Sequence, residues 1–273
     1  MGKAAMLIML MILVTACGTA DMQRPSPRPV DVQGNEPLSG GTNVGALSGG
    51  GLRTTSESVS YMNGVSGYLA KPEQGGPYPG IVMIHEWWGL NDNIKQMAEK
   101  LASQGYIVLA VDLFNGRVAA TQEEARSLVS QLDNQQAMQN LKSAVSYLRN
   151  VEKVPTIGTL GWCFGGGQSL LLSINDDVDA TVIYYGHVVA TPEQVNSLQA
   201  PVLGIFAEQD QAIPLQTAKE FDKKLDEAGI ENEIHYYPGV GHAFANPSGQ
   251  NYAPLETQDA WEKTLDFLER NLK

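Results

Sequence analysis

Short apolar runs alternate with helix-like segments over most of the chain, and this alternation constrains the fold more than any other feature. The runs are typical of strands buried on both faces of a sheet. They span residues 81–84, 106–111, 157–160, 180–185, 202–207 and 233–237, and helical patterns cover 91–104, 165–173, 215–228 and 252–272. Strands that alternate with helices pair mainly in parallel. We therefore expect an α/β fold with a mostly parallel central sheet and helices on both faces.

Two local signals add detail to this expectation. Asn63-Gly64 separates two strand-like runs at 59–62 and 67–70, which predicts a β-hairpin. Thr121 and Glu124 form a capping box that opens a helical region reaching about Arg149, with an interruption near 133–134.

A glycine-rich turn joins the run at 157–160 to the helical pattern that follows it. Its pattern, Gly-x-Cys-x-Gly around Cys163, is that of the nucleophile elbow of α/β-hydrolases with cysteine in place of serine. Such a sharp turn needs small residues two positions before and after the nucleophile. It also places Cys163 at a helix N-terminus, where the dipole favours a thiolate. The alternative is a tightly packed turn or a phosphate cradle, but the Walker lysine is missing.

An acid and a histidine follow the cysteine in the chain order that this fold requires. Asp210 comes just after the run at 202–207, and His242 lies in a glycine-rich loop after the last run. His242 would act as general base and acid, with Asp210 fixing its tautomer. Glu208 is the rival to Asp210. The structural alternatives are a turn cap for Asp210 and an ordinary loop position for His242.

These motifs together resemble the dienelactone hydrolase family of the α/β-hydrolase superfamily, from about Ser58 to the C-terminus. The similarity rests on IHEWWGLN at 84–91, GWCFGG at 161–166, YYG at 184–186, QD at 209–210 and GHAF at 241–244. The resemblance implies an α/β-hydrolase fold. It also implies an enzyme that cleaves carboxylic esters or lactones through a covalent acyl-cysteine.

The resemblance also implies further site residues. Glu86 would contact the resting cysteine and help to deprotonate it, and the alternative is a loop salt bridge. Fold logic gives one oxyanion-hole donor to the backbone N–H of Phe164, and the family pattern places the other at Trp87.

Several residues near these motifs are expected to contact substrate. We expect Trp88, Tyr185 and Phe244 to contact substrate, although some of the aromatic residues around the site can equally belong to the core. A substrate-binding arginine corresponds to Arg126, with Arg117 as a competitor. Carboxylate-selective members carry an arginine four residues after the histidine, and this chain has Asn246 there. Loss of one cation weakens the grip on a carboxylate and counts against dienelactone itself as substrate.

Composition excludes several classes of function. The chain has 18 basic and 30 acidic residues, a net charge of −12, which argues against nucleic-acid binding. The other histidines (His85, His187 and His235) have no further donors at metal-ligand spacing, and His85 is assigned to packing or orienting. We expect no metal, no cofactor, a small-molecule substrate and a monomeric protein.

The N-terminal segment has the pattern of a signal peptide followed by a flexible tether. An apolar run of eleven residues, Ala4 to Val14, follows Lys3 and is too short to span a membrane. Its end resembles a bacterial lipoprotein signal, which predicts a signal peptide at 1–16 and lipidation of Cys17; the alternative is an ordinary cleaved signal. Residues 17–56 then form a flexible tether and 57–273 the folded domain. The expected location is the cell envelope, with the outer membrane or periplasm favoured, or secretion.

Two other functions remain open. A binding protein of the envelope could keep this scaffold without catalysis, since a fold does not fix a function. An exported thiol could also serve a redox role, although no resolving cysteine accompanies Cys163.

Overall fold

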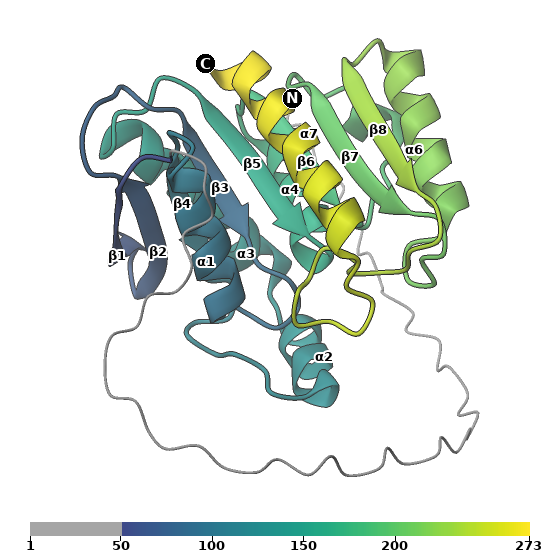
Figure 1. Ribbon diagram of the computed structural model, residues 1–273, viewed down its shortest axis with the longest axis horizontal. Helices are drawn as coiled ribbons and strands as arrows, with labels where there is room; N and C mark the ends of the chain where they lie inside the picture. Colours follow the sequence, from purple (N-terminus) through teal and green to yellow (C-terminus); the bar gives the residue numbers. More distant parts are fainter. Residues whose placement is uncertain (1–50) are drawn as a thin grey trace, which may run out of the picture. The chain divides into compact units, whose positions relative to one another are not determined.

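An eight-stranded sheet forms the centre of the computed structural model, which describes residues 51–273 (Figure 1). The predicted signal peptide, Cys17 and the tether up to residue 50 lie outside the described residues. The strands are β1 (Thr54–Met62), β2 (Val65–Pro72), β3 (Gly80–Ile84), β4 (Ile107–Val111), β5 (Ile157–Trp162), β6 (Ala180–Tyr184), β7 (Val202–Ala207) and β8 (Asn232–Tyr237). The helices are α1 (Asp92–Ala102), α2 (Gln122–Ser130), α3 (Asn134–Asn150), α4 (Phe164–Asn175), α5 (Pro192–Val195), α6 (Leu215–Ala228) and α7 (Pro254–Leu272).

The strand order is β1-β2-β4-β3-β5-β6-β7-β8. Strands β3 to β8 run parallel, whereas β2 is antiparallel to both β1 and β4. The chain moves outward from β3 to β4 and then returns to β5 on the other side of β3. This reversal is a topological switch point, and ligands of α/β sheets bind at the carboxyl ends of strands at such points. The predicted mostly parallel α/β fold is confirmed.

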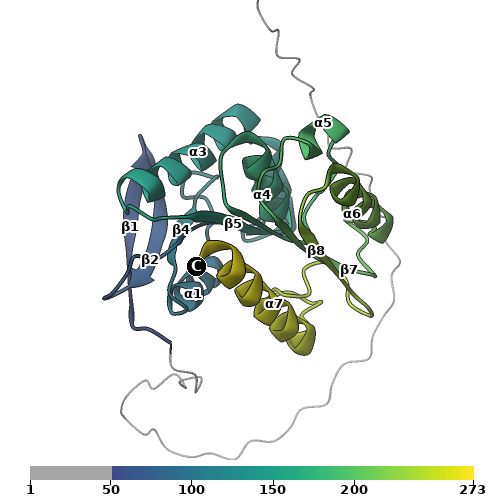
Figure 2. The same ribbon diagram turned by 90° about the horizontal axis from the view of Figure 1, so that it is seen from above.

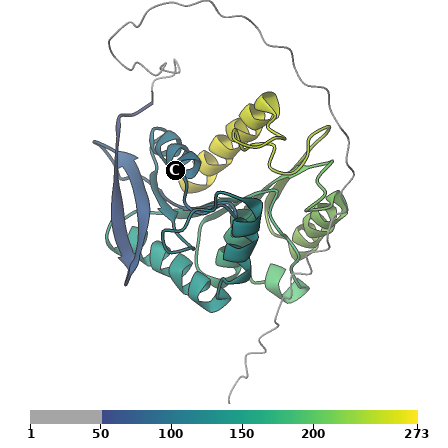
Figure 3. The ribbon, with the colours of Figure 1, turned by 90° about the horizontal axis from the view of Figure 1, so that it is seen from below.

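Helices cover both faces of the sheet. Figure 2 shows α1 and α7 on one face and α3, α4 and α6 on the other, and Figure 3 shows the same layers from the opposite end. The core on the α1 and α7 side contains Ile94, Leu101, Trp261 and Phe267. The other face has two clusters, one against α2 and α3 and one against α5 and α6.

The local signals are confirmed with small shifts. The hairpin of β1 and β2 turns at Asn63-Gly64, and Thr121 and Glu124 form the capping box of α2. The predicted start of the folded domain at residue 57 is too late, because Thr54 already pairs with Pro72.

The short helix α5 has no counterpart among the predicted helices. Its four residues are too few for a hydrophobic period to show, but Thr191 and Gln194 form a capping box around it.

Among residues 51–273, none of the helices has the length and apolar character needed to cross a membrane.

Candidate active site

Cys163 lies in a strained turn between β5 and α4. Its φ angle is 55°, in a region that residues other than glycine rarely adopt. A Cβ atom at Gly161 would lie 2.1 Å from the carbonyl oxygen of Gly165, and one at Gly165 would lie 2.3 Å from that of Ile84. Only glycine fits at these two positions, which explains the Gly-x-Cys-x-Gly pattern. Cys163 is also the N-cap of α4, so the helix dipole acts on its sulfur.

Strand register brings the predicted residues to one end of the sheet. Ile84 of β3 pairs with Gly161 of β5, so Glu86 and Cys163 each lie two residues beyond a paired position. Ala207 of β7 pairs with Tyr237 of β8, and the loops after both strands continue this contact. Asp210 and His242 come from these two loops.

A chain of hydrogen bonds joins Asp210, His242 and Cys163. Asp210 Oδ2 lies 2.7 Å from His242 Nδ1, and His242 Nε2 lies 3.0 Å from Cys163 Sγ. The other carboxylate oxygen of Asp210 accepts from the backbone N–H groups of Ala212 and Ile213, at 2.7 and 2.8 Å. These donors fix the carboxylate, which is buried, while His242 is partly exposed. Glu208, the rival acid, is exposed.

The environment of His242 favours its charged form. Burial alone lowers the pKa of the imidazole. Hydrogen bonds and charges from Asp210 and Cys163 outweigh this effect and raise the pKa of His242 to about 10. The imidazolium is therefore the form of His242 that lies 3.0 Å from Cys163 Sγ near neutral pH.

Glu86 is buried beside this chain of hydrogen bonds, but its own hydrogen bond is with Asn246. Asn246 Nδ2 donates to the Glu86 carboxylate, while the thiol of Cys163 is paired with His242. The expected contact between Glu86 and the resting cysteine is therefore not the arrangement in this structure. Burial raises the pKa of Glu86 to about 7, although the charge of His242 and the Asn246 hydrogen bond act in the opposite direction.

The two backbone N–H groups predicted to form the oxyanion hole have no acceptor in the described part of the chain. Within residues 51–273, the N–H groups of Trp87 and Phe164 donate to no other group. Gly165 packs against the carbonyl groups of Ile84 and His85, so the start of α4 lies directly against the end of β3. This packing holds the Trp87 and Phe164 segments side by side.

The structure divides the predicted substrate residues into two groups. Trp88 is partly exposed and packs edge-on against Trp87, with ring centroids 5.1 Å apart. Arg126 on α2 lies over the Trp87 ring, 6.0 Å from its centroid. Tyr185 and Phe244, in contrast, are fully buried. Contrary to the prediction that they contact substrate, their rings pack edge-on against each other in the core, and that of Tyr185 also packs against His242.

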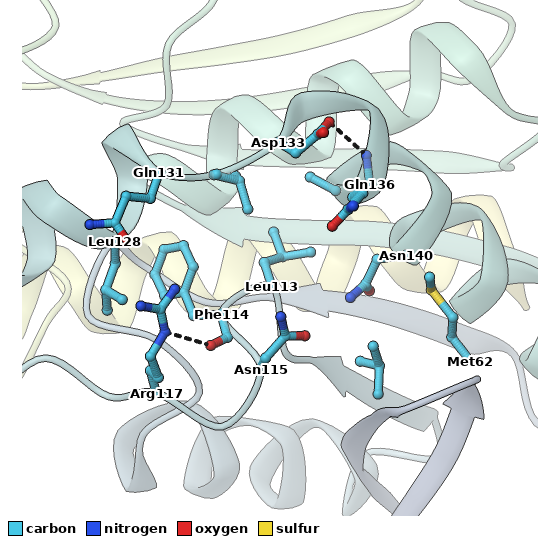
Figure 4. A pocket seen from close by; sticks show the side chains of 13 residues that line it. Met62, Leu113, Phe114, Asn115, Arg117, Leu128, Gln131, Asp133, Gln136 and Asn140 are labelled. Atoms are coloured by element: carbon cyan, nitrogen blue, oxygen red, sulfur yellow. Dashed lines mark hydrogen bonds between the residues drawn. The ribbon is translucent and has the colours of Figure 1, made fainter.

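Arg117, the competitor of Arg126, lines a separate pocket between the segment after β4 and helices α2 and α3 (Figure 4). Its Nε donates to the carbonyl oxygen of Phe114 at 3.3 Å. Gln131, Gln136 and Asn140 line the same pocket. Of the two arginines, Arg126 is the one that contacts a residue of the candidate site.

Two asparagines take part in the site although the sequence predicts no such contacts for them. Asn246, which stands where carboxylate-selective members have an arginine, donates to Glu86. Asn251 Nδ2 donates to the carbonyl oxygen of His242 at 2.9 Å and ties down the histidine loop. No sequence pattern predicts such contacts, because a single loop asparagine has many possible partners.

No group of three or more His, Cys, Asp or Glu side chains that could bind a metal ion occurs in the described part of the chain.

The chain is similar to known proteins over most of the described residues. The model of the dienelactone hydrolase family matches residues 65–272. Protein usf of Aquifex pyrophilus is 32% identical over 221 residues, which cover 76% of this chain and 94% of the relative. A protein of Methylorubrum extorquens, described as a candidate carboxymethylenebutenolidase, is 31% identical over 251 residues, covering 85% of this chain and 86% of the relative.

A solved structure shares the fold. The crystal structure of a candidate dienelactone hydrolase from Klebsiella pneumoniae superposes with a TM-score of 0.74 at 24% identity, covering 80% of this chain and 99% of the other. The fold, the extent of the family match and the similarity to curated relatives agree. The chain belongs to the dienelactone hydrolase family, a family of α/β-hydrolase enzymes.

Proposed function

We propose that the protein hydrolyses carboxylic esters or lactones through an acyl-cysteine intermediate. The observation that carries this proposal is the hydrogen-bonded chain from Asp210 through His242 to the sulfur of Cys163. The backbone N–H groups of Trp87 and Phe164 also support it: they have no acceptor within residues 51–273, they lie on segments that Gly165 packs together, and a tetrahedral intermediate needs such donors for its oxyanion.

The reaction has two halves. Cys163 attacks the carbonyl carbon while His242 holds the thiol proton, and the N–H groups of Trp87 and Phe164 bind the oxyanion. The intermediate collapses, the C–O bond breaks, and His242 gives its proton to the leaving alkoxide. His242 then takes a proton from water, whose oxygen attacks the thioester and releases the acid and the thiol. With a lactone the acid and the alcohol remain in one molecule, a hydroxy acid.

Glu86 acts as the priming group in this proposal. Its pKa of about 7 lets it exchange a proton near neutral pH, as a general base requires. To reach the sulfur, its carboxylate has to leave Asn246. In the observed arrangement it instead faces the charge of His242 and stabilises the imidazolium.

The substrate class follows from the family and from the mouth of the site. The M. extorquens relative is described as a candidate carboxymethylenebutenolidase, a lactone-cleaving activity, which supports lactones as substrates. Trp87 and Trp88, both partly exposed, offer an aromatic surface in the loop after β3, and Arg126 over Trp87 is the cation that a substrate carboxylate would meet.

The Cys163→Ala variant tests the proposal on a small aryl ester, with lactones and thioesters as a panel. We expect hydrolysis to disappear while the circular dichroism spectrum and melting temperature stay close to those of the wild type. Stoichiometric loss of activity on alkylation of the single described thiol gives a second measure. Full turnover by the variant would refute the mechanism, and absence of turnover by the wild type on the whole panel would favour a non-catalytic binding protein.

We further propose that Cys17 carries lipid and holds the domain at the cell envelope. The support is the signal-like segment at 1–16 alone. Expression with a radiolabelled fatty acid should label the wild type and not Cys17→Ser; equal labelling of both would refute the proposal.

A further inference from the structure

His85 is a fully buried histidine at the end of β3 with both ring nitrogens in contact with backbone. The backbone N–H of Leu113 donates to Nε2 at 3.2 Å. A backbone N–H can only donate, so Nε2 is an acceptor and the ring proton lies on Nδ1. Nδ1 therefore donates to the carbonyl oxygen of Glu86, at 2.6 Å. Burial lowers the pKa of His85, which agrees with a neutral ring.

The carbonyl group held by His85 belongs to the same peptide unit as the N–H of Trp87. A peptide unit is planar and trans, so fixing the direction of its C=O also fixes the direction of its N–H. The same carbonyl oxygen accepts a second hydrogen bond, from the N–H of Gly89 at 3.2 Å. Two donors thus hold one side of a peptide whose other side, the Trp87 N–H, is free.

The ring of His85 also packs against the residue that carries the other free N–H. It stacks on Phe164 with centroids 6.0 Å apart and an interplanar angle of 25°. Phe114 packs on His85 at 4.8 Å and on Phe164 at 5.6 Å, so the three rings form one cluster. This cluster connects the segments of both N–H groups.

We infer that His85 is a positioning residue that aims the oxyanion hole, a role that rests on the proposed function. Its hydrogen bond orients the Trp87 N–H toward the position of the oxyanion. A hydrogen bond accepted by the carbonyl also polarises the peptide and strengthens the N–H as a donor. His85 itself touches neither the sulfur nor the substrate.

Two variants test this role. His85→Phe keeps an aromatic ring between Phe114 and Phe164 but removes the bond to the Glu86 carbonyl. His85→Asn places an amide N–H group at the position of Nδ1, where it can still donate to that carbonyl. We expect His85→Phe to lose about 100-fold in kcat with little change in KM, since loss of one oxyanion donor costs about that much or more. His85→Asn should recover at least part of this loss.

Alkylation of Cys163 by iodoacetamide separates positioning of the oxyanion hole from damage to the nucleophile. In alkylation the thiolate displaces iodide from a saturated carbon, so no oxyanion forms and the hole is not needed. We expect His85→Phe to be alkylated at the wild-type rate over the same pH range. His235→Phe, at a partly buried histidine on β8 away from the site, is the matched control and should retain both activities.

A fall in kcat with unchanged alkylation supports the inference. Unchanged kcat in His85→Phe, or a parallel fall in kcat and alkylation, overturns it. If His85→Phe does not fold, the comparison rests on His85→Asn and His85→Gln, whose amide lies at the position of Nε2. A lower kcat in His85→Gln than in His85→Asn, at equal alkylation, supports the role, and equal kcat overturns it. Failure of the proposed function would show separately, as full activity of Cys163→Ala.

Discussion

Replacement of Asp210 by asparagine should reverse the direction of the hydrogen bond to His242 Nδ1 while keeping the shape of the side chain at position 210. The backbone N–H groups of Ala212 and Ile213 hold one oxygen of Asp210, and in the variant they would hold the amide oxygen. The amide NH2 would then face His242 Nδ1, where the carboxylate now accepts at 2.7 Å. The ring has to move its proton to Nε2, and in that tautomer it cannot take the proton of Cys163.

The structure gives a scale for the loss. The partners of His242 raise its pKa from 6.5 to about 10 against the effect of burial. This change corresponds to about 5 kcal/mol in favour of the imidazolium, shared between Asp210 and Cys163. Loss of the Asp210 share together with the wrong tautomer predicts a fall in kcat/KM of about 1,000- to 10,000-fold.

The assay is hydrolysis of a small aryl ester at pH 7, with circular dichroism and thermal melting to confirm the fold. Glu208→Gln is the matched control, because Glu208 lies two residues away in the same loop but is exposed. It should keep nearly full activity. A loss below tenfold in Asp210→Asn, or a comparable loss in Glu208→Gln, would refute the assignment of Asp210 as the orienting acid.

Three further results are expected at the positions packed around the nucleophile. Glu86→Gln should be more stable than the wild type by about 3 kcal/mol above pH 7 but not below pH 4.5. Burial raises the pKa of Glu86 from 4.5 to about 7, so the wild type loses stability relative to the variant as the pH rises through this range and the buried carboxyl becomes charged. Urea unfolding at pH 4.5 and 8 measures the difference in the free energy of unfolding between the two proteins, and an equal difference at both pH values would contradict the prediction. Asn246→Ala removes a donor from that carboxylate and should move the Glu86 limb of the pH–rate profile to higher pH, whereas an unmoved profile would show that Asn246 does not act on Glu86. Gly165→Ala should destabilise the fold by at least about 3 kcal/mol in urea unfolding, because its Cβ would lie 2.3 Å from a backbone oxygen, whereas Gly229→Ala, with open space around it, should cost about 1 kcal/mol.

Local patterns predicted the elements well because their causes are local. The helix expected at 215–228 is α6 with the same ends, and the break expected near 133–134 separates α2 from α3. Each of these rests on hydrophobic period, a cap or a glycine within a few residues. The elbow around Cys163 is predictable for the same reason, since its glycines are required by contacts within one turn and with the adjacent strand.

Orientation of side chains was the part that sequence could not supply. Phe244 lies two residues from His242, yet its side chain is fully buried against Tyr185 and Tyr237. The loop there passes through a positive φ at Ala243, which turns consecutive side chains to different sides. Asn246 shows the opposite case: its bond to Glu86 spans 160 residues of sequence, and only the folded sheet brings the two together.

The burial of Glu86 argues for a role in the reaction. The residue is 4% exposed, and above pH 7 its buried charge lowers the stability of the fold. A glutamine could accept the same hydrogen bond from Asn246 without this cost, so holding Asn246 does not explain a carboxylate. Groups with strongly shifted pKa values cluster at sites where a proton has to move. An acid with a pKa of about 7, next to His242 and Cys163, fits such a site, and Glu86→Gln should therefore gain stability and lose activity together.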